Sequence, residues 1–569
     1  MNKRIIIAAL TLLTLGMVTS CTKMKDQLQV GNPNAPTLDA NVKDLNGLLA
    51  FAKGGTYFNG FRDGMGWLGD SYFNLPWNYH ELMGDNTCGG EGSNNQTTTM
   101  GVPDWIELDG TSATKLENPS PQVDVIRTYN NRAATGNANN ALIYEWQAMY
   151  QLNAAMNTLL SQAQKLADAN TINSTQLQTV QAWAHFWKGF AYGNIGTMYY
   201  GGIIIDEAFG KSADFVSHDA MIAASDAQYD LASGILGAVS GNDYTDCLAR
   251  MIPDHCQVGL GAALSSGEWR KVINTLKARN IVLNHLSPFV NGSTSASITG
   301  SSMSPMTDGD WATVKTLTDG GIQIGDHVFT GRTAETNNFF SVGGGATGPY
   351  VTGKNITTGE KVSERLIQNF DPADVRFTSN FNDLSSFTNS YSFTTRWSLQ
   401  DCSDDGDGTH WNSGAYGYGT KTQGAYELIM AGSYEENALM GAEARIRTGD
   451  IDGGMALINA VKTYQGAGVT ASASDKATAL TELTKERRVA LAFRGLSFFD
   501  LRRWGWTYDV SKGGGAYHQV VVTPGAVDLE VYPDATISYN YMDYWDVPGD
   551  EIELNPPATG SEWTKNPNF

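Results

Sequence analysis

Oxygen-bearing side chains alternate along residues 401–407 in a spacing that could hold a calcium ion. The first, third, fifth and seventh positions of such a loop are Asp401, Ser403, Asp405 and Asp407. These ligands could converge on one cation because Gly406 allows a sharp turn. The twelfth position, where a bidentate Glu is expected, is Asn412. The pattern therefore favours a solvated Asp/Gly turn over a calcium site, and nothing else in the sequence indicates a cofactor.

Tryptophans in polar stretches could stack on a ligand. Pro103, Asp104 and Glu107 surround Trp105, which makes a core helix position unfavourable. Sugar rings offer apolar C–H faces to aromatic rings, while their hydroxyl groups need polar side chains nearby. The candidate platforms are Trp77, Trp105, Trp311 and Trp397. The alternative is that each ring fixes its own loop.

The sequence contains no intact catalytic motif. His80-Glu81 lacks the second His of a zinc-protease helix, and Gly210-Lys211-Ser212 lacks the first Gly of a phosphate loop. Gly495-Leu496-Ser497 lacks the second Gly of a nucleophile elbow. With 59 acidic residues, however, some carboxylate pair will always be present. A secreted, lipid-anchored glycoside hydrolase with two catalytic carboxylates therefore stays open as the alternative to a non-catalytic protein that only binds its ligand.

The first twenty residues predict export. A short basic start precedes the uncharged apolar run 5–17, which is shorter than the ~20 residues of a membrane-spanning helix. Val18-Thr19-Ser20 places small residues directly before Cys21, and this resembles the lipobox of bacterial lipoproteins. The resemblance implies a signal peptide over residues 1–20 and acyl chains, palmitate among them, on Cys21. The alternative is an ordinary signal peptide that Cys21 happens to follow.

The remaining cysteines are Cys88, Cys247, Cys256 and Cys402. Their number is even and the predicted compartment is oxidising, so disulfides are compatible with the sequence. Cys247 and Cys256 could clip a local loop, and Cys88 could then pair with Cys402. Free thiols are the alternative, because the sequence gives no Cα separations.

Composition excludes several classes of protein. The formal net charge of −21 opposes a generic nucleic-acid binder, which needs a basic surface. Apolar residues make up 41% of the chain, which is enough for a large core and argues against global disorder.

Helical periodicity dominates most of the remaining sequence. Apolar residues recur at spacings of three and four in the segments 141–200, 221–236, 258–286, 425–447, 454–464 and 477–504. Short polar breaks between these segments indicate helical hairpins, and recurring pairs predict a mainly α fold of tetratricopeptide-like helix pairs. The polar stretches 86–140 and 287–424 have poor periodicity and are predicted as long irregular insertions.

The segment 485–505, KERRVALAFRGLSFFDLRRWG, gives the strongest signal. An apolar stripe at helical spacing consists of Val489, Phe493, Leu496 and Phe499. Asp500 and Arg503 lie one turn apart and are expected to pair. These features predict one buried amphipathic helix.

This segment also closely resembles the hallmark helix of the SusD/RagB family of outer-membrane nutrient-binding lipoproteins. The similarity extends to 146–157, 183–202, 434–459 and the tail 545–567. Positions where family members often carry Glu, Glu, His and Arg are here Ala490, Arg494, Leu496 and Ser497. A local ion network is therefore expected to differ.

The resemblance implies a function. Family members capture oligosaccharides, or in some cases peptides, on the outer face of the outer membrane and deliver them to a SusC-like TonB-dependent transporter without catalysis. The resemblance also implies a division of the chain into a signal peptide over 1–20, an N-terminal SusD-like helical region over 21–240 and a C-terminal RagB/SusD region over 241–569. An aromatic residue in the early loop often belongs to the ligand platform of such proteins, which favours Trp105.

We expect Cys21→Ser to release the protein from membranes or to leave it unprocessed, because the thiol that carries the acyl chains is removed. Membrane fractionation at high salt measures the effect, with Cys402→Ser as the control that keeps the anchor. Full retention of Cys21→Ser in the outer-membrane fraction would contradict lipidation at this cysteine.

Overall fold

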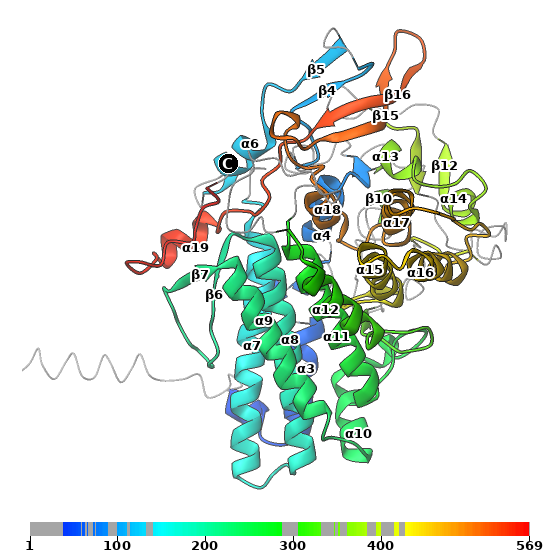
Figure 1. Cartoon of the computed structure of the whole chain (residues 1–569). Coiled ribbons are helices and arrows are strands. Elements are labelled where there is room, and N and C mark those ends of the chain that lie inside the picture. The colour runs from blue at the N-terminus through cyan, green and yellow to red at the C-terminus, as the bar shows by residue number, and fades with distance from the viewer. Residues whose placement is uncertain are drawn as a thin grey trace, which may run out of the picture.

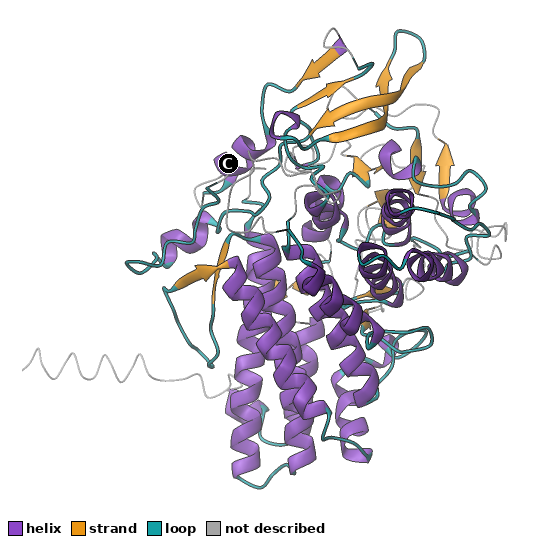
Figure 2. Cartoon of the chain, viewed as in Figure 1, coloured by secondary structure: helices purple, strands orange, loops and turns teal. Residues whose placement is uncertain are grey.

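The computed structural model describes most of the chain after the predicted signal peptide. The described residues are 38–58, 60–62, 65–66, 72–73, 75–88, 100–110, 114–131, 140–286, 305–331, 346–347, 351–352, 361–383, 394–399, 415–419, 427–567 and 569. Helices dominate this part, and short strands gather mainly at one end of the molecule (Figure 2). Among the described helices, none combines the length and the apolar character that crossing a bilayer requires. Cys21 and the candidate calcium loop 401–407 lie outside the described residues.

Long helices of the N-terminal half lie side by side as a bundle (Figure 1). They are α3 (Leu45–Lys53), α7 (Ile143–Asp168), α8 (Ser174–Met198), α9 (His218–Leu236), α10 (Asn242–Met251), α11 (Ser266–Asn284) and α12 (Asp308–Asp319). The link between α7 and α8 is sharp because Asn173 and Gln176 form a capping box, in which each side chain accepts from the other residue's backbone N–H. The hairpin predicted over 141–200 is confirmed.

A second group of paired helices lies C-terminal to the bundle. It consists of α15 (Tyr434–Arg447), α16 (Ile451–Tyr464), α17 (Lys476–Ala490) and α18 (Ser497–Arg503). Asp450 caps the N-terminus of α16, and Asp475 caps that of α17, by accepting from backbone N–H groups. The two groups together confirm the mainly α fold of tetratricopeptide-like helix pairs.

Two four-stranded antiparallel sheets cover other parts of the molecule. The larger has the order β15 (Ala516–Pro524), β16 (Leu529–Ser538), β4 (Trp105–Glu107) and β5 (Lys115–Glu117). The smaller has the order β12 (Phe381–Asp383), β13 (Trp397–Leu399), β11 (Lys361–Val362) and β3 (Thr87–Cys88). Both sheets join residues of the N-terminal region to strands that come several hundred residues later.

Short elements connect these parts. They are α2 (Leu38–Asn41), a π-helical turn (Gly54–Phe58), β1 (Gly60–Arg62), β2 (Met65–Gly66), α4 (Leu75–Met83), α6 (Gln122–Tyr129), β6 (Gly201–Ile203), β7 (Phe215–Ser217), two 3-10 turns (Asp254–Cys256 and Val510–Lys512), β8 (Thr330–Gly331), β9 (Ala346–Thr347), β10 (Val351–Thr352), α13 (Glu364–Ile367), α14 (Val375–Asn380), β14 (Leu428–Ile429) and α19 (Gly549–Leu554). The polar insertions thus contain short elements, notably α12 and β11–β13, which are too brief to produce a clear period in sequence.

The segment 485–505 is two helices and not one, so the single-helix prediction is wrong. Helix α17 ends at Ala490, and Phe493 and Gly495 have positive φ angles of 62° and 69° before α18 begins. The buried Glu81 carboxylate accepts from the backbone N–H groups of Phe493 (3.1 Å) and Gly495 (2.8 Å) and holds this turn. A left-handed conformation at a non-glycine residue needs such support.

The apolar stripe is nevertheless buried, as predicted. Leu496 and Phe499 belong to the main core. Val489 and Phe493 belong to a separate smaller core with β11, α13 and β12. The break between α17 and α18 therefore lets one segment supply side chains to two cores.

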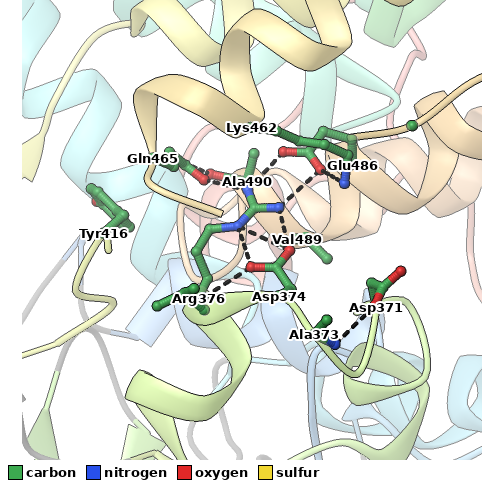
Figure 3. Close-up of polar contacts among 12 residues, drawn as sticks. Asp371, Ala373, Asp374, Arg376, Tyr416, Lys462, Gln465, Glu486, Val489 and Ala490 are labelled. Carbon is green, nitrogen blue, oxygen red and sulfur yellow. Dashed lines mark hydrogen bonds and ion pairs between the residues drawn. The ribbon is translucent and has the colours of Figure 1, made fainter. Parts of the chain in front are cut away.

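A buried network of charges joins α14 to α16 and α17 (Figure 3). Arg376 donates to Asp374 (2.7 Å) and Glu486 (2.7 Å), and Lys462 lies 2.8 Å from the same Glu486 carboxylate. The Gln465 side chain accepts from Arg376 at 2.8 Å. Two cations and two carboxylates thus share the site, and most of the donor groups of Arg376 have a partner.

Cys247, on the buried side of α10, is a free thiol, and burial raises its pKa to about 11. The local disulfide that its spacing to Cys256 allowed is therefore not formed. Cys402 lies outside the described residues, so its pairing remains a prediction.

We expect Arg376→Met to destabilise the fold by about 3–5 kcal/mol, because it leaves two buried carboxylates without their main cation. Arg250→Met is the matched control, since the Arg250–Asp246 pair is exposed and worth about 0–1 kcal/mol. Denaturant unfolding measures both variants. Equal stability of Arg376→Met and wild type would show that the network has no net role.

Candidate functional site

Trp105 lies on β4, a central strand of the larger sheet. Antiparallel register pairs Trp105 with Ser538 on β16 and with Glu117 on β5. The neighbouring triplet Ile106, Leu116 and Ile537 points to the opposite face, where Ile106 and Ile537 belong to the main core. Because side chains alternate along a strand, Trp105 lies on the face directed away from that core, where it is half-buried.

Polar side chains surround Trp105 on this outer face. Glu107, Lys115, Glu117 and Thr536 share the face by register. The Lys115 ammonium lies 4.5 Å from the centroid of the Trp105 ring and 3.0 Å from a Glu117 oxygen. The ring is thus held by a cation–π contact from one side. We call the outward residues of β4, β5 and the end of β16 the Trp105 face.

Asp104, directly before β4, has a buried carboxylate oxygen. Its Oδ2 accepts from Asn540 Nδ2 at 2.9 Å, while its Oδ1 is buried without a hydrogen-bond partner among the described residues. Burial raises the pKa of Asp104, although the Asn540 bond opposes the shift.

Trp311 is not an exposed platform, so that prediction is wrong. The residue lies in α12, its exposed fraction is 7%, and it belongs to the main core. The Arg447 guanidinium lies 5.7 Å from its ring centroid. The Asp308-Gly309-Asp310 sequence before it starts the helix, in which Thr307 and Asp310 form a capping box, and does not mark a loop.

Trp397 and Trp77 are also tied to the fold. Trp397, on β13, is half-buried against Phe377 and donates from Nε1 to Glu364 at 3.3 Å. Trp77, on α4, has an exposed fraction of 6% and packs edge-on against Phe73 with ring centroids 4.7 Å apart. Trp77 also lines a partly open cavity between the helical bundle and the turn that joins α17 to α18. The structure therefore does not bring the four candidate tryptophans together.

The buried carboxylates are mostly paired with arginines. Although burial opposes ionisation, Arg503 and Arg447 lower the pKa of Glu443 to about 2. Arg494 likewise lowers the pKa of Glu435 against the effect of burial. Burial raises the pKa of Glu81, but backbone N–H groups already occupy its oxygens. Glu435 and Glu443 lack the raised pKa that a general acid needs, and Glu81 is buried with both oxygens already hydrogen-bonded.

Comparison with known proteins identifies a family. The model described as SusD family matches residues 328–568. NanU of B. fragilis is 12% identical, with a TM-score of 0.56 and coverage of 94% of this chain and 100% of that chain. A SusD-like carbohydrate binding protein from Bacteroides fragilis is 11% identical, with a TM-score of 0.50 and coverage of 86% and 99%. No curated protein matches the sequence. At these identities the two structures show a shared fold.

Proposed function

The chain belongs to the SusD family, and on that premise we propose that it is a cell-surface protein that binds oligosaccharides and delivers them to a SusC-like TonB-dependent transporter. The carbohydrate binding protein that shares its fold supports this ligand class. Peptides are the second ligand class that the family resemblance allows. Anchorage through an acylated Cys21, on the outer face of the outer membrane, is part of the same proposal.

The Trp105 face is the observation that carries the proposal. It combines a half-buried indole with carboxylates, an ammonium and a hydroxyl on one sheet surface. Such a surface suits a sugar, whose C–H face can stack on the ring while its hydroxyls bond to the polar groups.

A glycoside hydrolase is the alternative function. Hydrolysis needs a carboxylic acid with a raised pKa opposite a second carboxylate. The pKa values of the arginine-paired Glu435 and Glu443 are instead lowered. Incubation of purified protein with glycans separates the two functions, because new reducing ends would favour the hydrolase.

We expect Trp105→Ala to weaken oligosaccharide binding by about 5- to 150-fold, because base stacking on an aromatic ring is worth about 1–3 kcal/mol and a sugar ring is comparable. Thermal stability should change little, since the ring lies on the outer face. Calorimetry against a glycan and peptide panel measures the affinity. Trp563→Ala is the matched control, because Trp563 is 40% exposed but lies on the C-terminal tail beside Tyr200.

A Trp105→Ala protein that melts much earlier but binds normally when folded would assign Trp105 a structural role. Equal losses in Trp105→Ala and Trp563→Ala would show that the effect is not specific to the Trp105 face.

We expect the protein to co-purify with a large β-barrel transporter after extraction in mild detergent. The charge of −21 predicts that part of this contact weakens at high salt. Mass spectrometry of the eluted complex identifies the partner. Recovery as a free monomer under several gentle conditions would contradict the transporter partnership.

A further inference from the structure

The loop between β6 and β7 lies beside the helical bundle, next to α7 (Figure 1). Its tip is a turn over residues 207–210, closed by a hydrogen bond from the Gly210 N–H to the Glu207 carbonyl at 3.1 Å. Phe209 is the third residue of this turn and has a φ angle of 60°. A positive φ at that position is typical of a type II turn, in which Gly or Asn is the usual residue. The turn therefore holds a bulky aromatic residue in a strained backbone conformation.

Phe209 differs from the other non-glycine residues with positive φ in the described part of the chain. Four of them have polar side chains of the types that tolerate this conformation, namely Asp85, Asn170, His518 and Asn540. Phe493 is buried in the smaller core. The Phe209 side chain is instead 81% exposed, so burial of the ring does not offset the strain. Backbone strain that the surrounding structure imposes is a feature of functional sites.

The first arm of the loop is fixed to the bundle by side chains. The Ile205 carbonyl accepts from Asn157 Nδ2 of α7 at 2.7 Å, and the Ile205 N–H donates to the Tyr192 hydroxyl of α8 at 3.0 Å. The next residue, Asp206, pairs with Lys188 Nζ at 2.9 Å, and the Lys188 side chain is buried. The backbone directly before the turn therefore has a fixed position.

The second arm of the loop is fixed to the C-terminal tail. The Ser212 carbonyl accepts from Asn555 Nδ2 at 2.8 Å, and the Ala213 carbonyl accepts from the Ala558 N–H at 2.8 Å. Leu554, the residue before Asn555, is 66% exposed at the end of α19. Anchors on both arms thus hold the strained turn in place, and two hydrogen-bonded segments each present an exposed apolar side chain.

The surroundings of Phe209 are acidic. Apart from Asp206, which Lys188 neutralises, the exposed charged residues of segments 204–214 and 549–567 are Glu207, Asp214, Glu553 and Glu562, with Lys211 and Lys565 as the cations. An excess of carboxylates opposes contact with anionic lipid headgroups, which attract basic segments. It also opposes a symmetric contact between two copies of this surface, because like charges would face each other. The charge favours a different protein whose surface is basic.

We propose that Phe209 anchors a protein interface, that the partner surface offers an apolar pocket with basic side chains at its edge, and that this partner is the transporter of the proposed function. Aromatic side chains are enriched in protein interfaces, and a few buried anchors supply most of the binding energy. The inference rests on the proposed function for the identity of the partner, and it adds the surface that contacts this partner. It does not involve the Trp105 face.

Three variants test the role of the ring. Phe209→Asn removes the ring and suits the positive φ, whereas Phe209→Trp keeps an aromatic side chain. Val527→Asn is the matched control, because Val527 is 92% exposed in the loop between β15 and β16. The transporter that co-purifies with the wild type is isolated in mild detergent, and biolayer interferometry measures its affinity for each purified protein.

We expect Phe209→Asn to bind the transporter about tenfold more weakly or worse, and the other two variants to stay within about threefold of wild type. Phe209→Asn should melt no earlier than wild type, because an exposed ring supports no core and Asn tolerates the turn.

Equal affinity of Phe209→Asn and wild type would overturn the role of Phe209 and leave the transporter partnership intact. An equal loss in Val527→Asn, or a much lower melting temperature of Phe209→Asn, would also overturn it. Absence of any transporter from the wild-type sample would overturn the proposed partnership, and with it the partner named here. Self-association or vesicle binding that Phe209→Asn abolishes would assign the ring to a second copy or to a lipid surface and would overturn the transporter as its partner.

Discussion

The structure depends on pairing the charged side chains that the segment 485–505 buries in the interior. The buried charged residues of this segment are Glu486, Arg487, Arg488, Arg494, Asp500, Arg502 and Arg503. An unpaired buried charge costs several kcal/mol, so each one requires a partner, either within the segment, as for Arg487 and Asp500, or from another part of the chain. Arg503 pairs with Glu443 of α15 at 2.8 Å, while Arg502 donates to the backbone carbonyls of Thr197, Leu283 and Asp543. One short segment thereby fixes the bundle, the second helix group and the C-terminal tail relative to one another.

The same constraint shapes the cavity. Glu81 holds the turn between α17 and α18, and this turn places Arg494, Gly495 and Leu496 in the cavity wall. Arg494 pairs with the Glu435 carboxylate at 2.9 Å, which compensates its charge. That the ion network differs from that of the family remains a prediction.

The Trp105 face has a different physical origin. It exists because β4 and β5 from the N-terminal region join β16 from the C-terminal region. Sheet register then separates core residues such as Ile106 and Ile537 from the outward Trp105. Pairing on both sides of β4 fixes the backbone that carries the half-buried ring. The surface and the cavity therefore use independent parts of the fold.

The sequence by itself determined the helical pairs, the burial of Phe493 and Phe499, and the Asp500–Arg503 pair, because local periodicity encodes all of these. It could not determine the break at residues 491–496, because a carboxylate about 400 residues away stabilises that turn. The positions of Trp105 and Trp311 were likewise decided by tertiary structure. Both follow acidic residues in sequence, yet strand pairing turns one toward the outer face and helix packing buries the other. Local composition describes the neighbours of a side chain along the chain, whereas exposure depends on which distant elements cover it.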